Sequence, residues 1–152
     1  MTGRLLGIAL LMLTLAVAST ARSQSWGPRS LEELKQETLE RARNAAGPIG
    51  EVRMADAERA MANLHSLERD DWAKVWSDIG EEYMAKAEAA RSPAEAREHY
   101  FYAWRYFDVG RWPTEKHSPG KRHSYERGLQ AFVRYGELLD PPVEVVHIPF
   151  ES

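Results

Sequence analysis

Two pairs of glutamates have the spacing closest to that of a general acid–base pair. Glu81 and Glu82 are adjacent, and Glu95 and Glu98 lie three residues apart. Paired carboxylates can act as acid and base when their surroundings separate their pKa values. All four fall at polar positions of helical patterns, where a solvated carboxylate is the default state. We therefore assign no catalytic residue to this chain.

Nucleophile, metal and phosphate motifs give no stronger candidate. No serine stands in the Gly-x-Ser-x-Gly frame of a strand-to-helix nucleophile elbow, and the sequence has neither a glycine-rich phosphate loop nor a His-Glu-x-x-His pair. His117 and His123 flank a turn without a carboxylate at metal-ligand spacing. The chain contains no cysteine, which excludes disulfides, thiolate metal sites and a cysteine nucleophile. The sequence predicts no metal site and no cofactor.

Composition and charge indicate a single globular helical domain. The 152 residues are 43% hydrophobic and 28% charged, which fits neither a disordered chain nor a membrane bundle. Arg4 and Arg22 are the only charged side chains among the first 23 residues, so residues 24–152 carry 18 basic and 23 acidic side chains. Basic residues gather between Arg111 and Arg134, but Glu115 and Glu126 interrupt them. Because a nucleic-acid surface needs a sustained positive stripe, we expect no nucleic-acid partner.

The first 23 residues have the pattern of a signal peptide. Arg4 precedes an apolar run from Leu5 to Val17, and small residues follow. Cleavage could follow Ala18 or Ser23, of which we favour Ser23. A retained membrane anchor is the alternative, but the run is shorter than the roughly 17–25 residues that span hydrocarbon. We expect an exported protein, periplasmic or extracellular, with no stable membrane span after cleavage.

Five helical segments follow, so the predicted fold class is all-α. Serines that can cap a helix mark the starts of two of them: Ser30 precedes Glu33, and Ser92-Pro93 precedes Glu95, both in capping-box spacing. In the third segment, Trp72, Trp76, Ile79 and Tyr83 form one apolar stripe, which we interpret as core. The expected helices span residues 30–46, 54–64, 70–90, 92–110 and 121–139.

The fourth segment is apolar on two sides. Six of the eight residues from Tyr100 to Phe107 are aromatic, with Trp104 and Phe107 on one face and Tyr102 and Tyr106 on roughly the opposite one. Such a helix needs two neighbours. The second neighbour is either another helix of a bundle or a pocket or docking surface, and a helical wheel does not distinguish them.

The fifth segment presents a predicted core face made mainly of large side chains, and the segment also holds two glycines. Gly128 and Gly136 leave room for a close backbone approach. If Phe132 lies in the core, its replacement by alanine should cost about 3–5 kcal/mol. The residues of this expected face are Tyr125, Leu129, Phe132, Gly136 and Leu139.

Residues 141–152 read as a linker and a terminal strand. A double proline, Pro141-Pro142, ends the helix and a β-branched run follows. A lone strand leaves its backbone groups unpaired, so we expect it to pair with strands of a domain absent from this chain. The predicted organisation is a signal peptide over residues 1–23, a helical domain over residues 24–140, and this strand.

The stretch from Glu95 to Glu151 resembles the helical N-terminal segment of a family of α/β hydrolases, that of the fermentation-respiration switch protein-like esterases and 2,6-dihydroxypseudooxynicotine hydrolase. The likeness is carried by four runs. They are residues 96–100 (Ala-Arg-Glu-His-Tyr), residues 103–107 (Ala-Trp-Arg-Tyr-Phe), the helix face from Tyr125 to Phe132, and residues 138–144 (Leu-Leu-Asp-Pro-Pro-Val-Glu) leading into Ile148-Pro149-Phe150-Glu151. In that family the segment leads into the first strand of the hydrolase sheet.

The resemblance implies a parent enzyme that hydrolyses an ester or a carbon–carbon bond of a small-molecule substrate. A missing C-terminal hydrolase domain would supply serine, aspartate and histidine, and the helices would form a cap that shapes substrate access. Tyr102, Tyr106 and Trp112 are the candidate access residues. The alternative is a small exported tetratricopeptide-like module that binds a protein, although no second copy recurs at a period of about 34 residues.

Overall fold

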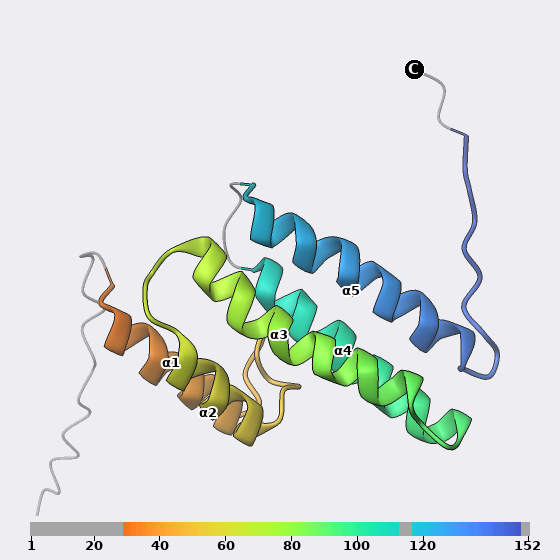
Figure 1. Cartoon of the computed structure of the whole chain (residues 1–152), viewed down its shortest axis with the longest axis horizontal. Helices are drawn as coiled ribbons and strands as arrows, with labels where there is room; N and C mark the ends of the chain where they lie inside the picture. The colour runs from red at the N-terminus through yellow and green to blue at the C-terminus, as the bar shows by residue number, and fades with distance from the viewer. Residues whose placement is uncertain (1–28, 113–116, 150–152) are drawn as a thin grey trace, which may run out of the picture.

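The computed structural model describes residues 29–112 and 117–149, and this part of the chain is all-α. It contains five helices and no strand, which confirms the predicted fold class and helix number. Each helix begins and ends within three residues of its predicted bounds. The helices are α1 (Leu31–Arg43), α2 (Met54–Asn63), α3 (Arg69–Glu88), α4 (Pro93–Arg111) and α5 (Pro119–Glu137) (Figure 1).

Serine caps fix the starts of three helices. Ser30 and Glu33 form the complete capping box predicted for α1, and the two donors on Ser30 lower the pKa of Glu33. Ser92 caps α4, but Glu95 accepts from the Arg91 N–H rather than from its own cap residue. Ser118 caps α5 with proline at the next position, so α5 begins before the predicted residue 121.

The core lies among α2, α3, α4 and α5, with α4 at its centre. The α3–α4 and α4–α5 helix pairs make the most extensive contacts, and the α1–α2 pair joins this bundle through α2 and α3 (Figure 1). Trp76, Tyr106 and Phe107 are fully buried, and the rings of Trp76 and Tyr106 stack. Both apolar faces of α4 are therefore covered by helices of this chain, as in the bundle alternative.

Two glycines allow Phe107 to sit at the crossing of three helices. A Cβ added to Gly80 of α3 would lie 2.9 Å from the Phe107 ring, and one on Gly128 of α5 would lie 3.2 Å from the Phe107 Cβ. Both approaches are closer than ordinary carbon contacts. The predicted close approach at Gly128 is confirmed, and it lets α4 and α5 pack around one aromatic ring.

The predicted core face of α5 is wrong at its large side chains, although Gly136 is buried as predicted. Tyr125 is 53% exposed and Leu129 is 52% exposed, whereas Phe132 and Leu139 are only partly buried. The buried face instead carries small residues, because α5 lies so close to α3 and α4 that large side chains do not fit between them. Its buried residues are Ser124, Gly128, Ala131 and Gly136.

The segment after α5 is extended, but no strand forms in its described residues 141–149. Val143 packs against Gly136, and its N–H donates to the Gly136 carbonyl at 3.0 Å. Beyond that contact the chain leaves the helices (Figure 1). Val145, Val146 and Ile148 are 62%, 70% and 83% exposed. The predicted strand is thus absent here, because a strand requires a hydrogen-bonded neighbour and no described segment lies beside these residues.

The predicted signal peptide, residues 1–23, lies outside the described residues. Within the described ranges, no helix has both the length and the apolar character needed to cross a bilayer.

Candidate functional site

Two of the three predicted access residues, Tyr102 and Tyr106, lie at the junction of α2, α3 and α4. Their rings stack with centroids 6.3 Å apart, and both contact the ring of Tyr83. Tyr106 is fully buried, whereas Tyr102 is partly exposed. In this fold Tyr106 has no surface that a ligand could touch, so any effect on a ligand would pass through its neighbours.

A buried carboxylate, Asp56, organises this junction. It is 9% exposed, and its Oδ2 accepts from the hydroxyls of Tyr106 at 2.5 Å and Tyr83 at 2.8 Å. Arg59 donates to Oδ1 at 3.0 Å, so the charge is paired. The Tyr106 hydroxyl also accepts from the Arg53 N–H at the start of α2. We call Asp56, Tyr83 and Tyr106 the tyrosine–aspartate cluster.

Both tyrosines of this cluster are held in the protonated form. Burial raises the pKa of each phenol first, and donation to the Asp56 carboxylate raises it further because the negative charge opposes a phenolate. A phenol so disposed is a poor general base. The cluster fastens α2 to the bundle, and its chemistry is that of a structural hydrogen-bond network.

Tyr102 forms the partly exposed edge of the same junction. The guanidinium of Arg53 lies 4.3 Å from the centre of its ring, and Arg53 also donates to Glu98 at 2.6 Å. This stacking covers one face of the ring. Tyr102 therefore packs beneath an ion pair at the surface.

Trp112, the third predicted access residue, directly follows the C-terminal end of α4. Tyr102 lies in the middle of that helix, ten positions earlier, which corresponds to a rise of about 15 Å. Trp112 is 49% exposed. The structure thus brings Tyr102 and Tyr106 together and leaves Trp112 at a separate surface.

Trp112 lines a groove of about 390 Å³ that we call the Trp112 groove. Its walls come from α1, the loops on either side of α2, the start of α3, the end of α4 and the start of α5. The volume is within the range of small-molecule sites. The large apolar side chains of its lining are Leu34, Ile49, Leu67, Trp72 and Trp112.

Cationic side chains dominate the polar lining of the groove. They are Arg29, Arg41, Arg69, Arg111 and Lys121, against one carboxylate, Glu37. This local excess of positive charge contrasts with the net charge of −3 for the whole chain. An apolar lining with a cationic rim suits a molecule that has an apolar body and an anionic group.

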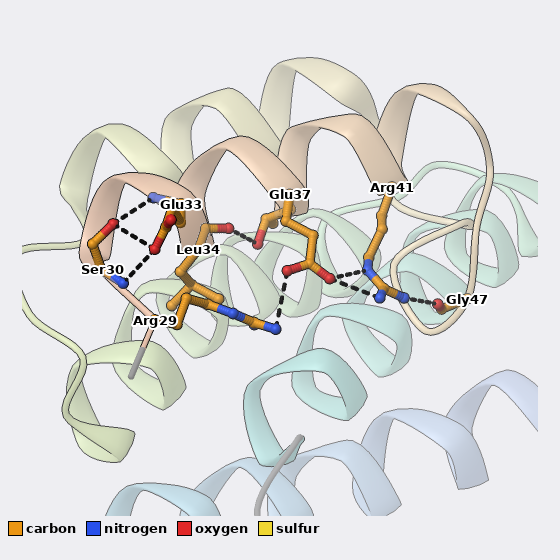
Figure 2. Close-up of polar contacts among 8 residues, drawn as sticks. Arg29, Ser30, Glu33, Leu34, Glu37, Arg41 and Gly47 are labelled. Carbon is orange, nitrogen blue, oxygen red and sulfur yellow. Dashed lines mark hydrogen bonds and ion pairs between the residues drawn. The ribbon is translucent and has the colours of Figure 1, made fainter. Parts of the chain in front are cut away.

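Three of these cations are already paired. Glu37 accepts from Arg29 at 3.0 Å and from Arg41 at 2.8 Å, and Arg41 also donates to the Gly47 carbonyl (Figure 2). Arg111 pairs with Asp108 at 2.6 Å. The side chains of Arg69 and Lys121 have no hydrogen bond or ion pair with a described residue. Within the part of the chain that the structure describes, these two are the groove cations without a partner.

The four glutamates considered as acid–base candidates are occupied by other contacts. Glu81 binds Arg127, and Glu82 binds Arg59 at 2.7 Å. Glu95 accepts a hydrogen bond from the Arg91 N–H at the start of α4, and Glu98 pairs with Arg53. Among the described residues, no three His, Asp or Glu side chains form a group that could hold a metal ion.

Sequence reasoning did not identify Asp56 or the groove. An acid in the first turn of a helix is commonplace, so no signal marked Asp56 as the acceptor for two tyrosines. The groove draws its residues from segments as far apart as Arg29 and Lys121. No spacing within the sequence links such segments.

Comparisons of this chain with protein-family models, with curated proteins and with solved structures give no match.

Proposed function

We propose that this chain carries the non-catalytic helical cap of an exported α/β hydrolase, which shapes substrate access to a separate catalytic domain. That domain would hydrolyse an ester or a carbon–carbon bond and would supply the serine, aspartate and histidine. The proposal is consistent with a helical fold in which the candidate acid–base glutamates make other contacts. Three of them form ion pairs, and Glu95 accepts a hydrogen bond from the Arg91 N–H at the start of α4.

The observation that carries the proposal is the exposed extended segment 143–149. Val143 is anchored on Gly136, while the next β-branched side chains, Val145, Val146 and Ile148, face solvent. Water-exposed valine and isoleucine in extended backbone are suited to pairing with a sheet, where their backbone groups and side chains would both be satisfied. In the resembling family, the corresponding segment enters the hydrolase sheet.

An activity-based probe tests this proposal. Antibodies against the helical domain would capture the protein from cells that produce it, and a tagged fluorophosphonate would label any activated serine. We expect label on the captured polypeptide. Pretreatment with unlabelled fluorophosphonate or with heat should abolish it. Captured protein that is never labelled would refute the hydrolase function.

The second candidate, a tetratricopeptide-like protein-binding module, is favoured by one observation. Helices α3 and α4 form an antiparallel hairpin with a short connection over residues 89–92 (Figure 1). Such hairpins are the unit of helical repeat arrays. This candidate predicts a captured protein without a reactive serine, so the same probe distinguishes the two functions.

A further inference from the structure

We propose that the Trp112 groove binds a small amphipathic carboxylate, with its apolar body against Trp112 and Leu67 and its carboxylate between Arg69 and Lys121. The inference is independent of the hydrolase proposal, because it concerns the helical domain alone.

Two apolar side chains in the groove lining are exposed. Leu67 is 52% exposed and Trp112 is 49% exposed, and both line the same groove from different segments. Trp72 forms part of the lining from within the core, with its indole N–H donating to the Val109 carbonyl at 2.8 Å. That bond fixes the start of α3 against the end of α4. The groove is thus a preformed hollow with two exposed apolar side chains that a ligand could cover.

The five cations of the groove differ in whether a described carboxylate pairs with them. The Glu37 carboxylate is shared by Arg29 and Arg41 (Figure 2), and Asp108 pairs with Arg111. Arg69 and Lys121 lack such partners among the described residues, although both line the groove. They approach it from the first residue of α3 and from the first turn of α5. An anion between them would gain two charge-assisted contacts without breaking an existing ion pair.

A carboxylate with an apolar body would match both the exposed apolar lining and the two unpaired cations of the groove. An uncharged apolar molecule would leave the free cations unused, and a fully hydrophilic anion would leave Trp112 and Leu67 exposed. The groove volume of about 390 Å³ suits a compact ligand rather than a folded partner.

Titration with decanoate below its micelle concentration tests the inference. The fluorescence of Trp112 and Trp72 should report saturable binding, and calorimetry should give one site per chain. Decanol, which has the same alkyl chain without the charge, should bind at least tenfold more weakly. Raising the salt concentration should weaken decanoate but not decanol.

Variants locate the site. The double variant Arg69→Gln/Lys121→Gln should weaken decanoate at least tenfold, and Trp112→Ala should do the same by removing an apolar wall. Arg134→Gln, at the far end of α5 and paired with Glu137, is the matched control and should bind like the unaltered protein. Far-UV circular dichroism should show the same fold for every variant, because none of the replaced side chains is buried in the core.

Three results would overturn the inference. They are decanol binding as tightly as decanoate, unchanged affinity in the Arg69→Gln/Lys121→Gln variant, and an absence of saturable binding. The last would show that the groove is only a surface hollow.

Discussion

Removing the two phenolic hydroxyls that share Asp56 Oδ2 should cost more in combination than separately. The hydroxyls of Tyr83 and Tyr106 donate to this one oxygen, while Arg59 occupies Oδ1. In Tyr83→Phe or Tyr106→Phe, the oxygen keeps one donor and each ring keeps its packing. A hydrogen bond to a charged group contributes about 1.5–3 kcal/mol, and we expect about 1.5–2 kcal/mol for each single variant because a donor remains.

The double variant leaves Oδ2 without either hydroxyl in a side chain that is 9% exposed. A buried acceptor that loses its last donor pays an additional desolvation penalty. We therefore expect a coupling of about 1–2 kcal/mol, so that the double variant loses about 4–6 kcal/mol in unfolding free energy.

Urea unfolding followed by circular dichroism and by tryptophan fluorescence measures this cycle. Tyr125→Phe is the control, since Tyr125 is 53% exposed and makes no hydrogen bond with a described residue, and it should change stability by less than about 0.5 kcal/mol. Additive losses in the double variant, within about 0.3 kcal/mol, would refute a shared acceptor.

Three further predictions concern pH, core packing and the extended segment. Stability should fall as pH rises above about 10, because tyrosines of the unfolded chain ionise there while the raised pKa of Tyr106 keeps it protonated in the fold. In urea titrations between pH 8 and 11, Tyr106→Phe should leave the slope unchanged near pH 8 and should make it less steep above pH 10, by up to about 1.4 kcal/mol per pH unit. Phe107→Ala should cost about 3–5 kcal/mol by chemical denaturation and Phe132→Ala only about 1–2, since Phe107 is fully buried and Phe132 is not; equal losses would contradict the described core. The purified chain should bind a hydrophobic dye or self-associate, and Val146→Lys/Ile148→Lys should reduce this while changing stability by less than about 0.5 kcal/mol; dye binding and association states that match the unaltered chain would exclude this segment as the cause.

The helices were predictable because their signals are local. Ser30 and Ser92 mark helix starts through capping chemistry, and the stripe of Trp72 and Trp76 marks a buried face through its period. Each signal depends on residues within a few turns of one another. The early start of α5 at Pro119 was missed although Ser118-Pro119 repeats the pattern of Ser92-Pro93.

The packing of α5 and the sites were not predictable because they depend on distances between helices. Tyr125 and Leu129 form a regular apolar stripe, yet α5 turns its small residues inward because Phe107 occupies the space beside Gly128. Asp56 becomes a buried hydrogen-bond acceptor only because α3 and α4 place the hydroxyls of Tyr83 and Tyr106 beside it. Tyr102 and Tyr106 were predicted on the fourth helix and Trp112 at its exit, and the rise along that helix separates Trp112 from the other two.

Hydrogen exchange of residues 145–148 in protein purified from producing cells tests the central claim most directly. If this segment enters the sheet of a hydrolase domain, its amides should exchange slowly, like those of α3 and α4, in material that reacts with the fluorophosphonate probe. Rapid exchange at Val145, Val146 and Ile148 in that material would contradict the claim, since the segment would then be as exposed to solvent as its side chains are in the described fold.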